Sequence, residues 1–472
     1  MDKLARPTSA SGPTLIRAVG LFTGTFLVAG VVIGSGVFKK IVPLAQSGLS
    51  EAWILAAWVL AGLITICGAL NLAGLSSLTE ESGGIYEYLR LSFGNFASFL
   101  FGWSDFTIIG TASVAALAFI FAQTINTLLP LPNPLQHLAQ VSIGQFIYPF
   151  ADSGIKILAI GTIVVLTWVN YRGVAGSGKL SNVFTAAKIM GILLLIILGL
   201  FMATPPTPTP PPLPNLNTAA VAGTPFFNAF FGALLSVFWA YDGWMDLSFV
   251  TGEVKNPRRN VPRAILFGVS IAIGLYVLVN YAYLRVLSLP ALAAVSPNEI
   301  GAAVVAEAIL GKTGKTWILV LIMISVFGSL NTVLLSHSRV YFRMAQERFF
   351  FAQARAVHPR YRTPHVALLY TCAWSCLLVL SGTFDRLTDL VIFGNFLFYG
   401  LLAVAVLKLK RQGKITVHVT GYPVIQLIIL LFALALTVNT IVTQPQQSLM
   451  GLALMLTSVP FYFYFKRKEA KA

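Results

Sequence analysis

Twelve apolar runs, each long enough to cross a lipid bilayer, constrain the fold more than any other feature of this sequence. A transmembrane helix needs about 20 predominantly apolar residues. The chain is 57% hydrophobic and 10% charged, whereas soluble domains carry about 25% charged residues. The sequence therefore predicts an all-α membrane protein with 12 transmembrane helices. The predicted spans are 19–43, 52–78, 95–125, 154–170, 179–203, 226–251, 263–288, 313–345, 365–382, 387–407, 422–443 and 447–465.

The basic residues predict how the chain is oriented. Most of the 32 Lys and Arg residues lie in or beside segments that are cytoplasmic if the N-terminus is cytoplasmic, which is the positive-inside pattern. We therefore expect a multi-pass protein of the plasma or inner membrane with both termini in the cytoplasm. The net charge of +16 and the cluster from Arg343 to Arg362 then signal topology and not nucleic-acid binding.

The cysteines exclude several classes of site. Cys67, Cys372 and Cys376 all lie in apolar runs, so they indicate neither a disulfide framework nor a metal site. The sequence also lacks a clustered His, Cys or acid constellation that could bind metal or act as a nucleophile–base pair. We expect no enzyme activity, no metal and no cofactor.

Two connecting segments have distinctive compositions. Glu80 to Phe93 mixes charges, glycines and aromatics, which is typical of a short interfacial helix. Thr204 to Pro214 is proline-rich and predicts an extended polyproline-type spacer.

The first apolar run contains three poor helix formers in a row, Gly34, Ser35 and Gly36. Small residues can let two membrane helices pack closely. Alternatively, the helix opens here, and an opened backbone is tolerated in a membrane only where it faces a cavity, water or a ligand. The run alone leaves both interpretations open.

A second interruption suggests an internal repeat. The run at 226–251 contains Asp242 and Gly243 within Phe238–Trp244. Interrupted helices in corresponding positions of two halves indicate a transporter binding site. We therefore predict, within a single domain 1–472, a five-helix repeat at 19–203, a second at 226–407 in the opposite orientation, and two additional helices at 422–465.

Lys188 is an ionisable residue inside a predicted span, roughly 13 Å from its cytoplasmic end at 1.5 Å per residue. Such residues are functional by default. The Lys188 ammonium could bridge two helices where a sodium ion would otherwise sit, or it could carry a proton; we favour the bridge.

Other polar and aromatic residues within the spans have less specific roles. Asp242 could contact a substrate amino group, gate the site, or cap a half-helix. Asp246 and Asp105 are interpreted as helix-packing residues or as partners of cytoplasmic arginines, and Arg339 and Arg343 as anchors or gate salt bridges. Trp239 could close over a ligand.

His337, the histidine clearly within a span, is interpreted as a packing residue without a ligand role.

Several ordered motifs resemble one family, the L-type amino acid transporters of the amino acid–polyamine–organocation (APC) superfamily. Gly34–Phe38 resembles the first-helix motif, and Tyr241–Trp244 followed by Glu253–Pro257 and Val261–Ile265 resembles the sixth. Phe327–Asn331 with Ser338–Phe342 is similar to the eighth helix, and Ser82–Leu89 to the loop after helix 2.

The resemblance implies the LeuT-like 5+5 inverted-repeat fold and amino acid transport, usually by exchange. The N–H groups around Ser35 would receive a carboxylate at the positive end of a half-helix, and carbonyls before each break would receive an ammonium. Lys188 matches a lysine of sodium-independent members. The implied substrate residues are Val32, Ile33, Gly34, Ser35, Gly36, Val37, Phe238, Trp239, Ala240, Asp242 and Gly243.

The chain also departs from the family pattern. The segment Leu128 to Ala151, where human members form a disulfide to a heavy subunit, has no cysteine, so we expect no covalent partner. Met245 stands where Asn is frequent and Trp239 where Phe is frequent, which leaves the side-chain class open.

We expect a sodium-independent exchanger of neutral amino acids. The alternatives are a proton-coupled symporter, a transporter of cationic amino acids, and a non-transporting amino acid sensor.

Overall fold

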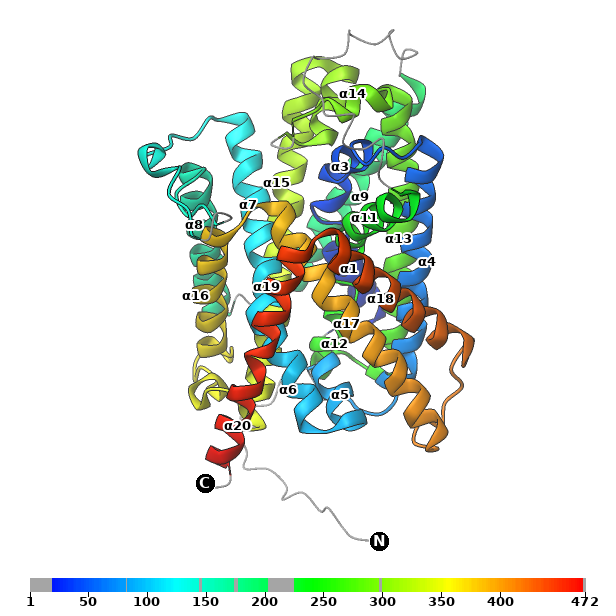
Figure 1. Ribbon diagram of the computed structural model, residues 1–472, viewed down its shortest axis with the longest axis vertical. Helices are drawn as coiled ribbons and strands as arrows, with labels where there is room; N and C mark the ends of the chain where they lie inside the picture. Colours follow the sequence, from blue (N-terminus) through cyan, green and yellow to red (C-terminus); the bar gives the residue numbers. More distant parts are fainter. Residues whose placement is uncertain are drawn as a thin grey trace.

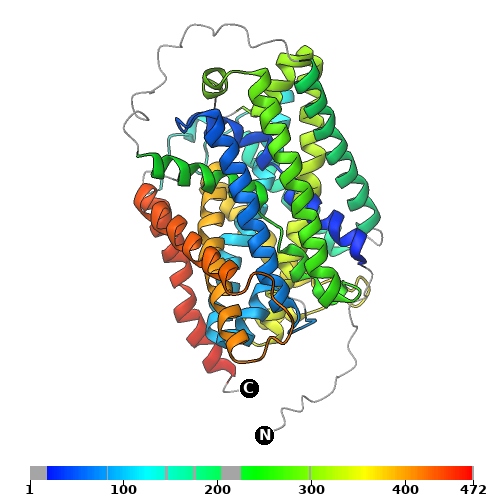
Figure 2. The ribbon, with the colours of Figure 1, turned by 90° about the vertical axis from the view of Figure 1, so that its right-hand side faces the viewer.

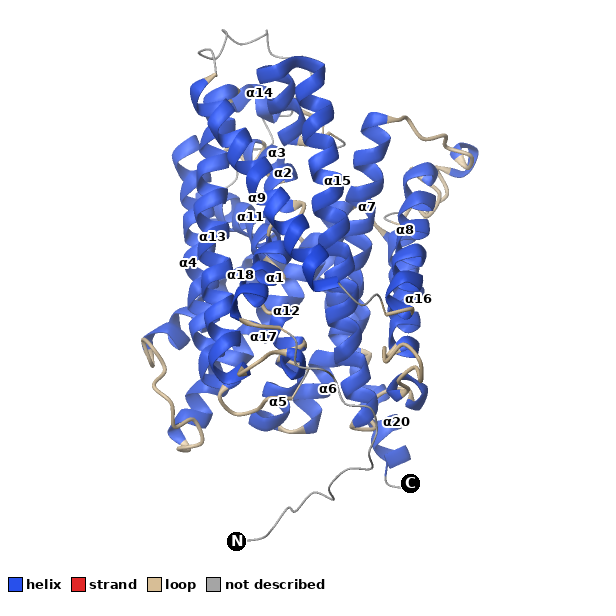
Figure 3. Ribbon diagram, turned by 180° about the vertical axis from the view of Figure 1, so that it is seen from behind, coloured by secondary structure: helices blue, strands red, loops and turns tan. Residues whose placement is uncertain are grey.

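The computed structural model describes residues 19–81, 83–143, 147–173, 177–202, 225–296 and 299–469, with side chains left undescribed at 177–183 and 469. These residues form helices and connecting loops, without a β-strand among them (Figure 3). Isolated bridges pair Val19 with Val254 and Ile143 with Ile147. The predicted spacer Thr204 to Pro214 lies outside the described residues. The all-helical class is confirmed.

The helices of the first half include one three-residue 3-10 turn, η2, and one π-helical turn, η1. They are α1 (Leu21–Val32), α2 (Gly36–Lys39), α3 (Ile41–Ala45), α4 (Glu51–Ser76), α5 (Ile85–Phe93), α6 (Asn95–Ser104), η1 (Asp105–Ile109), α7 (Gly110–Leu128), η2 (Gln136–Leu138), α8 (Ser153–Tyr171) and α9 (Ser177–Phe201). The short helix predicted within Glu80 to Phe93 is α5.

The second half contains the longest helix, α15, which is kinked at Gly311 with φ of 64°. Its elements are α11 (Phe226–Tyr241), α12 (Asp246–Phe249), η3 (Thr251–Glu253), α13 (Pro257–Val286), α14 (Leu289–Ala293), α15 (Gly301–Gln346), η4 (Ala352–Arg355), α16 (His365–Ser381), α17 (Phe384–Arg411), α18 (Val424–Thr443), α19 (Pro445–Leu456) and α20 (Ser458–Glu469).

Ten helical segments among the described residues are long and apolar enough to cross a membrane. The predicted spans at 226–251 and 365–382 contain the shorter apolar helices α11 and α16. The predicted span at 313–345 begins just after the kink at Gly311, which separates it from the helical residues 301–310 of α15.

Both predicted interruptions are present. Helix α1 ends at Val32, Ile33 leaves the helical region with ψ of 72°, and α2 begins at Gly36. Helix α11 ends at Tyr241, Asp242 is extended, and Gly243 has φ of 86°. The opened-helix interpretation of Gly34–Gly36 is therefore confirmed. Gly adopts positive φ without the steric cost that a Cβ brings, which explains Gly243.

The long helices surround these breaks. Helix α13 lies beside α4 and α1, and α15 lies beside α7 (Figures 1 and 2). Helices α3 and α14 lie toward one end of the molecule, and α5 and α20 toward the other (Figure 1). The two breaks therefore lie between the ends, within the helical bundle.

Candidate functional site

The two helix breaks contact each other directly. A Cβ added to Gly36 would lie 2.5 Å from Cα of Ala240, a distance that real side chains do not adopt. A Cβ on Gly243 would collide with Val31 Cγ1. The packing interpretation of the small residues is thus also correct at Gly36. This glycine follows the opened segment, and because it has no side chain the other broken helix can pack closely against it.

A cavity of about 370 Å³ lies at this junction. It includes seven of the predicted substrate residues, and these are Val32, Gly34, Ser35, Gly36, Trp239, Asp242 and Gly243. Ile33, Val37 and Ala240 are buried but do not line it, and Phe238 lines a neighbouring cavity. The cavity is also lined by residues outside the predicted substrate set, among them Ser113, Leu117, Asp246, Val333 and His337.

The carbonyl groups before the breaks lie close to hydroxyl groups. Tyr276 Oη lies 2.6 Å from the Val32 carbonyl oxygen and 2.9 Å from that of Ala240. Because a phenol has a single hydrogen, it can donate to only one of the two at a time. The Ile33 carbonyl accepts a hydrogen bond from Ser325 Oγ at 3.1 Å. The carbonyls are therefore less open than the sequence suggested, and the Val32 carbonyl also accepts a hydrogen bond from the Gly34 N–H at 2.7 Å.

Lys188 is tied to the end of α1. Its Nζ donates to the Gly30 carbonyl at 2.7 Å and to Ser329 Oγ at 3.0 Å, and the residue is 1% exposed. Ser329 Oγ also donates to Gly30 at 3.0 Å. The Lys188 side chain thus links α9, α1 and α15 immediately before the break.

Trp239 lies beside the first break. Its indole Nε1 donates to Ser35 Oγ at 3.1 Å, and its ring meets Phe384 edge-on at a centroid distance of 5.9 Å. The side chain is 7% exposed. Trp239 therefore connects α11 to the Gly34–Gly36 segment and to α17.

Asp242 lies at the second break, where its Oδ1 accepts a hydrogen bond from Asn395 Nδ2 at 2.8 Å. Tyr399 Oη is more distant, at 3.4 Å. Both partners are neutral, and Asp242 has no salt bridge to another described residue. Asp242 also lines the neighbouring cavity of about 500 Å³, which is mostly apolar.

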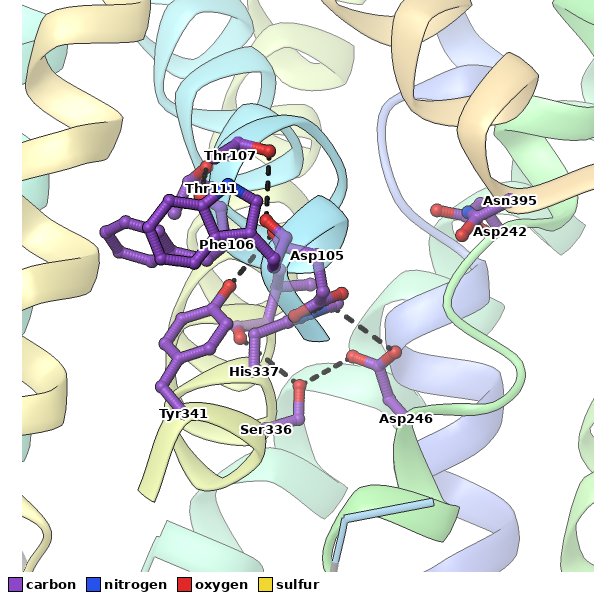
Figure 4. Close-up of polar contacts among 12 residues, drawn as sticks. Asp105, Phe106, Thr107, Thr111, Asp242, Asp246, Ser336, His337, Tyr341 and Asn395 are labelled. Carbon is purple, nitrogen blue, oxygen red and sulfur yellow. Dashed lines mark hydrogen bonds and ion pairs between the residues drawn. The ribbon is translucent and has the colours of Figure 1, made fainter. Parts of the chain in front are cut away.

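Asp105 and Asp246 contact His337 and not arginine, so the expectation of arginine partners is wrong. His337 Nδ1 lies 2.9 and 3.0 Å from the two oxygens of Asp105, and its Nε2 lies 3.8 Å from Asp246 Oδ1. Asp246 Oδ2 also accepts from Ser336 Oγ at 2.7 Å (Figure 4). Gly110 makes this possible, because any side chain there would collide with the imidazole.

The π-helical turn η1 carries Asp105 and exposes backbone carbonyls that side chains satisfy. Tyr341 Oη donates to the Asp105 carbonyl at 3.1 Å, Trp374 Nε1 to Thr107 at 3.0 Å, and Thr111 Oγ1 to Phe106 at 2.6 Å (Figure 4). Single π turns inside α-helices are frequent at functional sites. Here the turn holds the Asp105 carboxylate beside the His337 imidazole.

Several salt bridges join residues that come after the helix breaks in the sequence. Arg339 Nε donates to Glu253 Oε1 at 2.6 Å, so the predicted salt-bridge role of Arg339 is confirmed. Arg343 lies 2.9 Å from Glu347. Beyond the first break, Lys40 Nζ lies 2.7 Å from Asp385 Oδ1 and 3.0 Å from Thr388 Oγ1.

Comparison with known proteins assigns this architecture to a family. Residues 19–464 match the amino acid permease family. The chain belongs to the amino acid permease family. It is 30% identical over 464 residues to the serine/threonine exchanger SteT of Bacillus subtilis (strain 168), covering 97% of this chain and 98% of that relative. This permease is therefore a multi-pass membrane protein, and the resemblance seen in its motifs is confirmed.

Two human relatives cover a similar extent of the permease. It is 30% identical over 459 residues to the large neutral amino acids transporter small subunit 2, covering 97% of this chain and 82% of the relative. It is 28% identical over 459 residues to the Asc-type amino acid transporter 1, covering 97% of this chain and 84% of the relative. The relatives are transporters and not enzymes.

Replacing His337 with alanine should destabilise the permease. Asp105 is fully buried, and removing one partner of a buried ion pair costs about 3–5 kcal/mol because it leaves an uncompensated charge. We expect a lower midpoint of thermal unfolding in detergent for His337→Ala. Adding Asp105→Asn should restore part of the loss, because the amide carries no charge. An unchanged midpoint in His337→Ala would contradict the pairing.

Proposed function

We propose that this permease is a sodium-independent transporter that exchanges neutral amino acids by alternating access. The observation that carries the proposal is the cavity at which both broken helices meet, lined by Ser35, Gly36 and Gly243. Paired broken helices provide backbone donors and acceptors to a small zwitterion. The names of the relatives, which are amino acid transporters and in one case an exchanger, support the same class.

In the proposed complex, the α-carboxylate is received by the backbone N–H groups around Ser35, Gly36 and Val37. These groups begin the helical segment that continues through α2 and α3, and the first N–H groups of a helix lack intrahelical acceptors. The α-ammonium would lie near the Val32 and Ala240 carbonyls, between which Tyr276 shares one hydrogen. Trp239 would act as the occluding lid, releasing Ser35 when the substrate enters.

Sodium independence rests on Lys188. A buried ammonium already contacts the Gly30 carbonyl and Ser329, which are oxygen ligands of the kind that a sodium ion would use. Because the Lys188 ammonium places a positive charge at this position, substrate binding does not require a separate cation. The proposed alternative role of Lys188, as a proton carrier, requires that it lose this charge during transport.

The architecture we propose has 12 spans in two inverted repeats, 19–203 and 226–407, followed by 422–465. Both termini would be cytoplasmic in a plasma or inner membrane. We propose no disulfide-linked heavy subunit, because the three cysteines lie in helices within the apolar runs.

Asp242 supports a second candidate, transport of cationic amino acids or coupling to protons. Its carboxylate lines the cavity and is hydrogen-bonded to the neutral Asn395 side chain. An unpaired buried carboxylate attracts a cationic group or a proton. We rank this candidate second because Asn395 already satisfies one of the carboxylate oxygens.

Transport by the purified protein in proteoliposomes tests the proposal. We expect uptake of a radiolabelled neutral amino acid only when the vesicles contain unlabelled amino acid, at equal rates in sodium and choline buffers. Uptake into empty vesicles that requires an inward proton gradient would favour the symporter, and inhibition by arginine or lysine would favour a cationic substrate. Binding without flux would indicate a sensor. No transport under any of these conditions would contradict the proposal.

A further inference from the structure

Three ionisable side chains from three separate elements meet beside the cavity between the breaks. Asp105 comes from η1, His337 from α15 and Asp246 from α12, and none of them is more than 6% exposed. In the described part of the chain, His337 is the basic residue that both carboxylates contact. The proposed recognition of the α-carboxylate and α-ammonium uses none of the three.

The geometry around the imidazole accommodates a proton between His337 and Asp246. His337 Nδ1 lies 2.9 Å from Asp105 Oδ1, and because a carboxylate only accepts, this nitrogen carries a hydrogen. Nε2 lies 3.8 Å from Asp246 Oδ1. A neutral ring has one hydrogen and one lone pair, so it would direct its lone pair toward the Asp246 carboxylate. A proton on Nε2 replaces that repulsion with attraction between opposite charges.

The site of this proton is reached through the cavity. His337 and Asp246 line the cavity, as does Asp242 at the second break, whereas Asp105 does not. Tyr341, one turn further along α15, donates to the Asp105 carbonyl. The described titratable groups that face the ring from η1, α12, the break and α15 are therefore acids and a phenol. A positively charged ring meets no like charge among them.

Asp246 connects this cluster to the second break. It begins α12 three residues after Gly243, and α12 packs against α15. Ser336 Oγ on α15 donates to Asp246 Oδ2 at 2.7 Å, while the imidazole faces Oδ1 (Figure 4). With the proton in place, both Asp246 oxygens attract α15. Without it, one of the two contacts becomes repulsive, so α12 is held less firmly.

We propose that Asp105, His337 and Asp246 form a proton-binding site that makes exchange depend on pH. With the proton on His337 Nε2, Asp246 holds α12 against α15. When the pH rises, the proton passes from Nε2 to water in the cavity, and repulsion between the lone pair and Asp246 frees α12. Exchange then slows, because the second break no longer has a fixed position. The inference adds regulation by pH to the proposed exchange function, on which its transport readout rests.

The experiment measures exchange of one radiolabelled neutral amino acid in proteoliposomes that have the same pH inside and outside. The range from about pH 5 to about pH 9.5 contains the ordinary titration of histidine. Wild-type exchange should fall by at least about threefold with rising pH, close to the lower limit of ordinary coupling between two sites. Asp246→Asn should lose this fall, because a carboxamide can accept from a charged ring and donate to a neutral one. Titration of the substrate itself cancels from the ratio of the two rates.

Two further variants separate the proton from general loosening. His337→Gln can donate to Asp105 but does not take up a proton, and it should lose the fall as Asp246→Asn does. The matched control is Glu253→Gln. Arg339 Nε on α15 donates to Glu253 Oε1 at 2.6 Å, so this variant also loosens the segment after the second break from α15 but leaves the cluster intact. It should keep the wild-type fall with pH, whatever its rate.

Thermal unfolding in detergent gives a readout that does not depend on transport. If the folded protein holds the proton at a pH where the unfolded chain has released it, stability falls as the pH rises. The unfolding midpoint should therefore fall more steeply with rising pH in wild type than in His337→Gln.

The proposal fails if wild type and Asp246→Asn have the same pH profile of exchange, or if Glu253→Gln loses the fall as well. It also fails if the unfolding midpoints of wild type and His337→Gln change in parallel. Each of these results leaves exchange of amino acids by the wild-type protein intact. Absence of exchange in wild type would instead contradict the proposed function, and the unfolding midpoints would still decide on the proton site.

Discussion

Gly36→Ala should reduce the exchange rate by at least about tenfold per reconstituted molecule. The added methyl would lie 2.5 Å from Cα of Ala240 and 2.9 Å from its backbone N. Because these are mainly backbone atoms, no side chain can move aside, and overpacking of this kind costs about 1–3 kcal/mol. The two broken helices must then separate, which moves the proposed carboxylate and ammonium sites apart. Initial rates of amino acid exchange measure the effect.

The control is Gly232→Ala, on α11, the helix whose Ala240 contacts Gly36. A Cβ there meets nothing within 4 Å, and alanine favours helix more than glycine does, so transport should persist. Normal exchange by Gly36→Ala would show that close contact of the breaks is not required. An equal loss of exchange activity in both variants would indicate that exchange is sensitive to any substitution in α11 and its neighbours.

Lys188→Ala should also lower exchange by about 10- to 100-fold. The variant removes a charged hydrogen bond, worth about 1.5–3 kcal/mol, from the Gly30 carbonyl. It also leaves Gly30 and Ser329 facing a cavity where the ammonium was. We expect α1 to lose its fixed position relative to α9 and α15, and therefore expect slower exchange in both sodium and choline buffers.

Lys156→Ala is the comparison for this variant, because Lys156 is also buried and also donates to a carbonyl, that of Tyr148. It lies on α8, away from the lining of the cavity, and should retain exchange. Full activity of Lys188→Ala at normal expression would reject the bridging role. If wild type accumulates substrate under an imposed proton gradient, and Lys188→Ala still exchanges substrate at the wild-type rate but no longer accumulates it, Lys188 is the proton carrier.

The breaks were predictable because their chemistry is local. Gly34, Ser35 and Gly36 interrupt an apolar run with poor helix formers, and Asp242 with Gly243 interrupts another. Lys188 was predictable for a similar reason: a charge inside an apolar span needs polar partners nearby. The sequence could not indicate that Gly30 and Ser329 would be the polar partners of Lys188, because this contact depends on how three helices meet.

Ser113 and His337 were missed as cavity residues because their positions depend on how α7 and α15 are rotated. The π turn at Asp105–Ile109 shifts the face that each later residue of α7 presents, and nothing in the run signals such a turn. His337 was interpreted as a packing residue, yet its ring lies between two carboxylates. Gly110 leaves room for the imidazole, but its importance could be recognised only once the three-dimensional arrangement was known.

The partners of Asp105 and Asp246 were predicted wrongly for a related reason. Arginines lie nearby in the sequence of α15, at Arg339 and Arg343, but they contact Glu253 and Glu347. Helical periodicity places His337 on a different face from these arginines. The expectation that cytoplasmic arginines pair with these acids therefore gave the wrong partners, because the direction of each side chain places His337, and not an arginine, beside Asp105 and Asp246.

The central claim is that the two helix breaks bind the α-carboxylate and the α-ammonium of an amino acid. Competition against exchange in proteoliposomes by L-alanine, L-alanine methyl ester and N-acetyl-L-alanine tests it most directly, because the derivatives block one group each and share the side chain. The account predicts that L-alanine competes and that each derivative is at least about a hundredfold weaker, since a buried partner is left unpaired in both cases. Competition by either derivative at the strength of L-alanine would contradict the claim.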